Sequence, residues 1–101
     1  MKQEKLLLKQ FIDKKDMSNM DLSKMIFKEL DFQNCNFTNS DLSGTRFIKC
    51  NCENANFSNC KIDKNTLFIS GSIAHANMHK VPFYSYVFEG CNAIKAYWDL
   101  G

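Results

Sequence analysis

The side chains with the clearest capacity for chemistry in this sequence are five thiols and two imidazoles. They are Cys35, Cys50, Cys52, Cys60, Cys91, His75 and His79. Zinc ribbons usually carry C-x-x-C pairs, and secreted disulfide scaffolds carry an even number of cysteines. This set is odd and lacks such a pair. It therefore favours neither kind of site, and a reducing compartment suits it.

Several of the cysteines belong to a wider pattern, in which an apolar residue returns at every fifth position between Met20 and Leu67. These residues are Leu22, Phe27, Phe32, Phe37, Leu42, Phe47, Cys52, Phe57, Ile62 and Leu67. A helix repeats about every 3.6 residues and a strand every two. A period of five therefore requires a chain that turns a corner in each repeat and points one residue inward, which is the pattern of a solenoid.

A second inward position lies two residues before each of these centres, and it is small or apolar throughout. Cys35, Cys50, Cys60 and Cys91 occupy it. Positions two apart in an extended segment share a face, so we expect these thiols to fill the core rather than to bind metal or attack a substrate. His75 and His79 are expected on the surface, because a corner separates them where a metal-binding pair would need a helix.

Individual five-residue units carry a more specific pattern. Examples are residues 40–44 (SDLSG), 35–39 (CNFTN) and 55–59 (ANFSN). These units resemble those of the pentapeptide-repeat family, whose consensus is a small residue, Asp or Asn, Leu or Phe, and two polar residues. The resemblance implies an all-β solenoid, namely a right-handed quadrilateral β-helix with one unit per side. A shift of twenty residues places Leu22 on Leu42 and Phe37 on Phe57, which favours four units per coil over three.

The period of five slips once after Leu67 and resumes at Ile73, continuing to Trp98. One extra residue within Phe68 to Ser70 accounts for the slip. We interpret it as a corner bulge near residues 68–71, beside Gly71, where glycine tolerates unusual dihedral angles. The solenoid then occupies residues 16–101 and makes about four coils.

Residues 1–15 do not follow the period of five. Leu7, Leu8, Phe11 and Ile12 fall at helical spacing, which predicts a short amphipathic helix. Such a helix would cap the first coil, whose core otherwise faces nothing. Five lysines against two acidic residues give this segment a charge of +3 and leave the solenoid at −1. A basic amphipathic helix that meets a membrane surface or a partner groove is the alternative.

The sequence contains no Ser, His and acid grouping, no phosphate-binding loop and no HExxH motif. We therefore expect no enzymatic activity, no cofactor and no metal site. No apolar run is long enough for a membrane span or a secretory signal. The protein is expected in the cytoplasm, and the pattern suits a bacterial or a phage protein.

Stacking units twenty residues apart produces one surface column that is apolar and basic. Its members are Ile26, Lys28, Arg46, Ile48, Lys49, Phe68, Ile69 and Val87. Exposed apolar residues in a contiguous column indicate an interface, so we expect these residues to bind a protein partner. The alternative is that some of them pack under the N-terminal helix or the bulge.

The C-terminus ends on Tyr97, Trp98 and Leu100, with no polar helix to close the final coil. An uncovered coil presents unpaired edges. We therefore expect two copies to form a homodimer by stacking these ends, with Trp98 near the axis.

Two classes of function remain open. The first is a small non-enzymatic protein-binding module, for example an inhibitor or an adaptor. The second follows from the resemblance, since some pentapeptide-repeat proteins mimic duplex DNA and modulate DNA gyrase or topoisomerase IV. That role needs acidic columns, and here Asp21 and Asp41 are diluted by Lys24 and Lys61. Direct nucleic-acid binding is disfavoured, because the basic residues are scattered outside the leader.

Overall fold

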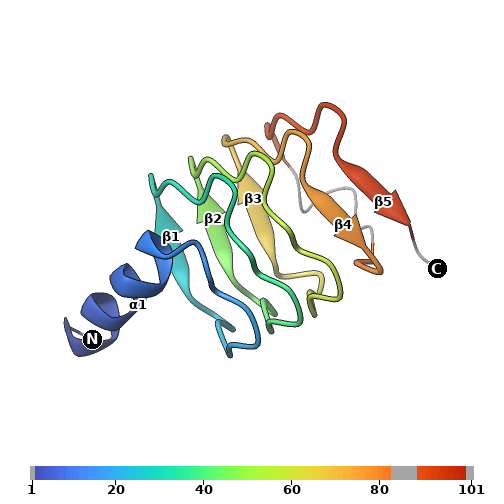
Figure 1. Ribbon diagram of the computed structural model, residues 1–101. Coiled ribbons are helices and arrows are strands. Elements are labelled where there is room, and N and C mark those ends of the chain that lie inside the picture. The colour runs from blue at the N-terminus through green and yellow to red at the C-terminus, as the bar shows by residue number, and fades with distance from the viewer. Residues whose placement is uncertain (1, 83–88, 100–101) are drawn as a thin grey trace.

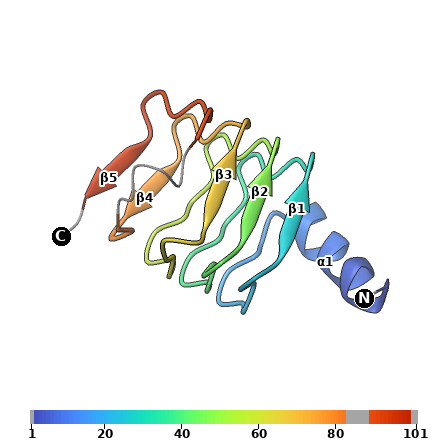
Figure 2. The same cartoon turned by 180° about the vertical axis from the view of Figure 1, so that it is seen from behind.

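The computed structural model describes residues 2–82 and 89–99. Within them a helix, α1 (Lys2–Asp13), precedes five short strands: β1 (Ile26–Lys28), β2 (Arg46–Ile48), β3 (Leu67–Ile69), β4 (Asn77–His79) and β5 (Tyr97–Asp99). The strands form two parallel sheets, of order β1-β2-β3 and β4-β5. The chain advances coil by coil from α1 at one end to β5 at the other (Figure 1). The reverse view shows the same stacking (Figure 2).

Single parallel bridges extend the stacking beyond the strands. Asp16 pairs with Asn36, Asp21 with Asp41, and Asp31 with Asn51, so each residue meets the one twenty positions later. Together with β1 and β2, these bridges form four ladders spaced five residues apart along the chain. The molecule is therefore a β-solenoid in which corresponding units of successive coils lie side by side.

The extra residue lies earlier than the sequence analysis placed it. The pairing interval is twenty residues at Asp41 and Lys61, but it is twenty-one at Arg46 and Leu67. The added residue must therefore lie between Lys61 and Leu67, not within residues 68–71. This change of register makes Phe68 the inward centre, at 3% exposure, and leaves Leu67 half-buried beside it.

The corners of the coil use residues with left-handed backbone angles. The last residue of the regular units has a positive φ, as at Asn34 (63°), Asn39 (62°), Asn54 (60°) and Asn59 (61°). Asparagine enters this region more readily than most residues because its short side chain bonds locally. Asparagine at the fifth position thus favours the turn in these units, and Lys24, Glu29 and Lys49 adopt the same backbone angles in theirs.

Aromatic rings fill the interior. Phe32, Phe37, Phe47 and Phe57 are at most 1% exposed. Phe37 stacks on Phe57 of the next coil, with ring centroids 4.8 Å apart, while Phe32 meets Phe37 edge to face at 5.2 Å. Such pairs add to the stability already gained from burying the rings. The stacked contact therefore joins two successive coils, and the edge-to-face contact joins two neighbouring ladders within one coil.

The small inward position also links the coils through hydrogen bonds. The Ser40 hydroxyl donates to the carbonyl of Met17 at 2.5 Å, and the Thr45 hydroxyl donates to the carbonyl of Leu22 at 2.6 Å. The Cys60 thiol donates in the same way to the carbonyl of Phe37 at 2.8 Å. Each partner lies 23 residues earlier. Where this inward position carries a hydroxyl or a thiol, the side chain thus donates to a buried carbonyl of the preceding coil.

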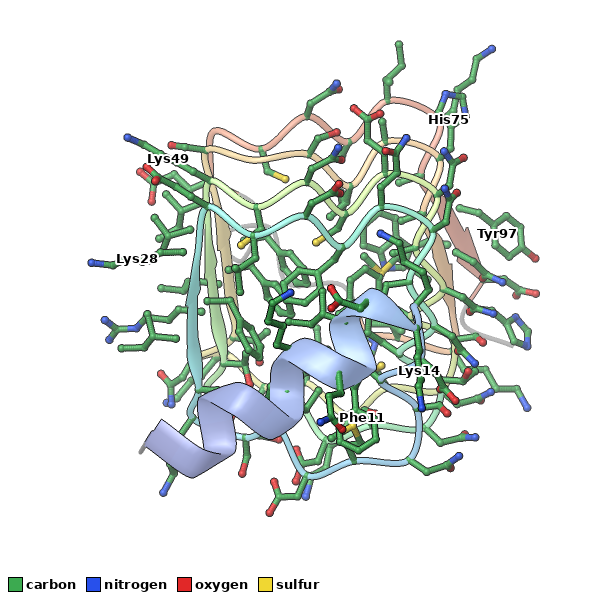
Figure 3. All side chains as sticks on the ribbon, turned by 60° about the vertical axis from the view of Figure 1, so that its left-hand side comes forward. Phe11, Lys14, Lys28, Lys49, His75 and Tyr97 are labelled. Atoms are coloured by element: carbon green, nitrogen blue, oxygen red, sulfur yellow. The ribbon has the colours of Figure 1, made fainter. Side chains whose placement is uncertain are left out.

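The helix α1 lies across the first coil, as the view toward that end shows (Figure 3). Leu8 and Ile12 pack against the hydrophobic core. The carbonyl of Phe11 accepts a hydrogen bond from the amide of Asp16 at 3.0 Å, which joins the end of the helix to the first coil. The Phe11 ring itself remains 40% exposed.

Candidate functional site

The strongest candidate for a binding surface is the outer face of β1, β2 and β3. The centre of each strand points inward, so its two neighbours point outward. The strand register brings these neighbours into two columns. One consists of Ile26, Arg46 and Leu67, and the other consists of Lys28, Ile48 and Ile69. We call these six residues, together with Lys49, the lateral face.

The lateral face combines accessible apolar atoms with positive charge. Ile26 is 58% exposed, although it lies on a strand, and Ile48 and Ile69 are half-buried. Lys28 and Lys49 are exposed and extend away from the coil on the β1 side (Figure 3). An apolar strip flanked by cations is a typical composition for a surface that another protein covers.

Two of the residues expected in this column, Phe68 and Val87, are not part of the lateral face as the structure describes it. Phe68 does not belong to the surface, because the change of register turns its ring inward onto Phe47. Leu67 takes its place, and sequence reasoning missed it because either of two adjacent large apolar residues can serve as the centre. Val87 lies outside the described residues, so its assignment stays a prediction.

A shallow groove of 570 Å³ continues the lateral face around one corner. Lys24, Arg46 and Lys61 line it together with Asp41 and Asp63. Asp63 accepts backbone hydrogen bonds from Gly44 at 3.1 Å and from Asn65 at 2.9 Å, so its carboxylate holds the corner together. The groove is therefore slightly basic and extends the positive rim of the lateral face.

Most outward Asp and Asn side chains are engaged in turns. The Asp21 carboxylate accepts a hydrogen bond from the Ser23 hydroxyl at 2.6 Å and from the Ser23 amide at 3.0 Å. These two bonds lower the pKa of Asp21, and the corresponding bonds from Ser18 lower the pKa of Asp16. Asn56 accepts the same pair of bonds from Ser58. The Asp and Asn of the repeat thus form the corners.

The thiols lie inside, as expected. Cys35, Cys50, Cys52 and Cys60 are at most 3% exposed, and Cys91 is half-buried. Burial raises the pKa of Cys35 to about 11 and the pKa of Cys60 to about 12. Because the thiolate is the nucleophile and the metal ligand, these protonated thiols are poor candidates for either role.

The two histidines have different surroundings. His75 is exposed at a corner with a φ of 59°. His79 lies on β4, where its Nδ1 is 3.3 Å from the carboxylate of Asp99 on β5. The Tyr97 hydroxyl donates to the same carboxylate at 3.1 Å. In residues 2–82 and 89–99, no group of three or more His, Cys, Asp or Glu is placed to hold a metal ion.

The residues assigned to a C-terminal interface are only partly described. Tyr97 is 52% exposed on β5, while Trp98 is half-buried and packs against the core. Leu100 lies outside the described residues. In the part of the chain that the structure describes, no helix has the length and apolar character needed to cross a bilayer.

A parallel β-solenoid with a filled aromatic core and an apolar, basic lateral face defines a structural repeat protein. The sequence profile of the family described as pentapeptide repeats matches residues 16–44 and 26–63, with 8 copies. The chain belongs to the pentapeptide-repeat family, whose members are in general non-enzymatic interaction modules. We found no significant match among curated proteins or among solved structures.

Proposed function

We propose that this protein is a non-enzymatic module that binds one protein partner through its lateral face, acting as an inhibitor or an adaptor in the cytoplasm. The observation that carries the proposal is Ile26, which is 58% exposed and shares the outer face of the sheet with Ile48 and Ile69 of the neighbouring column. Exposure of such an apolar strip to water is unfavourable, and covering it with a partner lowers the free energy. Lys28, Arg46 and Lys49 would favour a partner with acidic residues around an apolar centre.

The test compares two variants that each add one charge to an exposed or partly exposed isoleucine. Ile48→Asp changes the lateral face. Ile94→Asp changes a residue that is 59% exposed but lies beyond β4, outside that face. Wild type and both variants serve as bait in host lysate, with bound proteins identified by mass spectrometry. We expect a partner that is lost with Ile48→Asp and retained with Ile94→Asp. Equal recovery by all three baits would contradict the proposal.

Modulation of DNA gyrase or topoisomerase IV by DNA mimicry is the alternative. It would require an acidic column along the rod, and the ladder that begins with Asp21 and Asp41 continues into Lys61. The longest dimension of the molecule is 35 Å, which makes it a short mimic. Recovery of topoisomerase subunits in the same experiment would favour this alternative over an unrelated partner.

We also propose a homodimer formed by the C-terminal ends through Tyr97, Trp98 and Leu100. Support comes from β5, which is the last strand of its sheet, and from the exposed ring of Tyr97. Light scattering should give a dimer mass for wild type and a monomer mass for Trp98→Asp, with Ile94→Asp as the charge-matched control. A monomer mass for wild type would contradict the dimer.

We infer a right-handed, four-sided coil of about four turns, with α1 as the cap of its first turn. The four ladders support the four sides, and the packing of Leu8 and Ile12 against the core supports the cap. Deletion of residues 1–15 should then lower the thermal midpoint and expose a surface that binds a hydrophobic dye.

A further inference from the structure

A second binding surface lies at the N-terminal end of the solenoid, between α1 and β1. There the helix and the first coil enclose a groove of 790 Å³. Its floor is apolar and includes Leu8, Ile12, Met25 and Leu30, all of them partly buried. The groove opens at the end of the coil, whereas the lateral face lies along its side, and the two surfaces share Ile26 and Lys28 of β1 at their border.

One wall of this groove is the backbone of an edge strand. In its sheet β1 pairs only with β2. Bonds to the second coil use the carbonyl of Met25, which accepts from Arg46 at 2.8 Å, and the amide of Glu29, which donates to Ile48 at 2.9 Å. Alternate residues of a strand bond to opposite sides. The amides and carbonyls of Ile26 and Lys28 therefore face away from β2, where no described residue pairs with them.

The charge around the groove is positive. Lys9 and Asp13 form an ion pair at 3.0 Å and offset each other. The remaining charged residues of the lining are Lys15 and Lys28 against Asp31. The segment 1–15, to which α1 belongs, carries a charge of +3. An occupant with negative charge is therefore favoured, and a second copy of this chain would bring like charges together.

We propose that an extended acidic segment of another protein binds here by adding a strand to the free edge of β1. Its backbone would pair with Ile26 and Lys28, its apolar side chains would enter the groove against Leu8 and Leu30, and its carboxylates would face Lys15 and Lys28. Strand addition satisfies exposed backbone groups of an edge while alternate side chains fill pockets. This binding mode shares Ile26 and Lys28 with the lateral face, but it uses the backbone edge of β1 and the groove and does not require the isoleucines of β2 and β3.

The experiment uses the full chain and a fluorescently labelled probe, a capped peptide of alternating valine and glutamate of about six residues, the usual strand length. Fluorescence anisotropy should show saturable binding that weakens with salt, because screening reduces the attraction. A peptide of alternating valine and lysine should not bind. The valine-glutamate peptide with N-methylated backbone amides should also fail, because it cannot pair with the strand.

Protein variants separate the backbone from the side chains. Ile26→Pro removes an amide that faces away from β2, so the bonds between coils remain, and proline is tolerated on edge strands. Binding should weaken by about tenfold, the effect of one lost hydrogen bond. Ile26→Val keeps the amide and should bind as wild type does. Lys28→Glu should weaken binding through charge alone. Ile94→Asp, at an exposed residue between β4 and β5 and far from the groove, should leave binding unchanged.

Three results would overturn the proposal. They are equal binding of the lysine and glutamate peptides, full binding of the N-methylated peptide, and equal affinities for Ile26→Pro and Ile26→Val when both are folded by circular dichroism. If Ile26→Pro does not fold, the N-methylated peptide and Lys28→Glu still decide the question. Binding of the valine-glutamate peptide and its loss on N-methylation test strand addition alone, so this proposal can fail without the lateral face, and the lateral face can fail without it.

Discussion

The Phe68 ring stacks on the Phe47 ring, with centroids 4.6 Å apart and planes within 1° of parallel. This contact shows how the extra residue is absorbed. Between Lys61 and Leu67 the chain adds one residue at a corner, and the next coil then returns to register with the one before it. A solenoid can tolerate such an addition because corners face solvent, whereas a shift inside the core would turn every following centre outward.

The centre of the aromatic core should be the least tolerant part of the protein. Phe47 contacts five other phenylalanine rings, those of Phe27, Phe32, Phe37, Phe57 and Phe68. Phe47→Ala leaves a cavity that none of these packed rings can fill, so we expect a loss of about 3–5 kcal/mol in the free energy of unfolding. Urea unfolding followed by circular dichroism measures it. Ile94→Ala, at an exposed site, should change stability by less than about 0.5 kcal/mol.

The hydrogen bonds from the small inward position should add to the free energy of unfolding, separately from the effect of side-chain volume. Thr45→Val keeps the shape of the side chain but removes the hydroxyl that donates a hydrogen bond to the buried Leu22 carbonyl. The other bond to this carbonyl, from the Met25 amide, is long at 3.4 Å. The carbonyl would thus be left largely unsatisfied, which costs about 1–3 kcal/mol, and urea unfolding should show a loss in that range. Thr45→Ser keeps the hydroxyl and should lose only the effect of one methyl group, about 1 kcal/mol. A larger loss for Ser than for Val would show that packing alone sets this position.

Substitution should destabilise the protein at one glycine, Gly71, and be tolerated at another, Gly44. A Cβ on Gly71 would lie 2.2 Å from the carbonyl oxygen of Cys50, so Gly71→Ala forces two coils apart. We expect a loss of about 3 kcal/mol, at the upper end for overpacking. Gly44 has a φ of +69°, near the values of Asn39 and Asn59 in the same position of their units. A Cβ there would lie 3.3 Å from the Cγ of Lys24, a flexible side chain that can shift. Gly44→Asn should therefore be tolerated within about 0.5 kcal/mol, as thermal unfolding would show.

Acid should destabilise the protein partly through its turn carboxylates. Hydrogen bonds from Ser18 and Ser23 lower the pKa of Asp16 and Asp21 from the ordinary value of 3.8. A carboxylate whose pKa is lower in the folded state stabilises the fold fully at pH values above its pKa in the unfolded state. This contribution disappears as the pH falls through the pKa of the folded state. Stability measured by urea unfolding should therefore decline below about pH 4.

A double variant isolates this contribution. Asp16→Asn together with Asp21→Asn keeps an oxygen that can accept the turn hydrogen bond, as Asn36 and Asn56 do in their own units. It removes two titrating groups, so its stability should decline less steeply with acid than that of wild type. Identical acid profiles for both proteins would show that these turns do not contribute to the pH dependence.

The expectation that the thiols fill the core could be formed without a structure, because Cys35, Cys50 and Cys60 share the phase of the repeat. The repeat pattern likewise predicts that Arg46 and Ile26 lie on the surface. The choice between Leu67 and Phe68 as a centre was not. Both residues are large and apolar, and only the fit of the Phe68 ring on Phe47 distinguishes them.

The sequence by itself determined the β-solenoid, because a five-residue period leaves each unit one inward centre and one corner, and both are local requirements. It also placed the turns at the polar trailing positions of each unit, such as Asn34 and Asn59, where Lys24 and Lys49 adopt the same positive φ in their own units. Only the tertiary structure decided which atoms meet between coils. The bond from Ser40 to Met17 spans 23 residues, and the groove between α1 and β1 exists because a helix outside the repeat packs against the first coil. Neither follows from the period alone, because the period states neither which donor and acceptor atoms of stacked units come into contact nor where a helix outside the repeat packs.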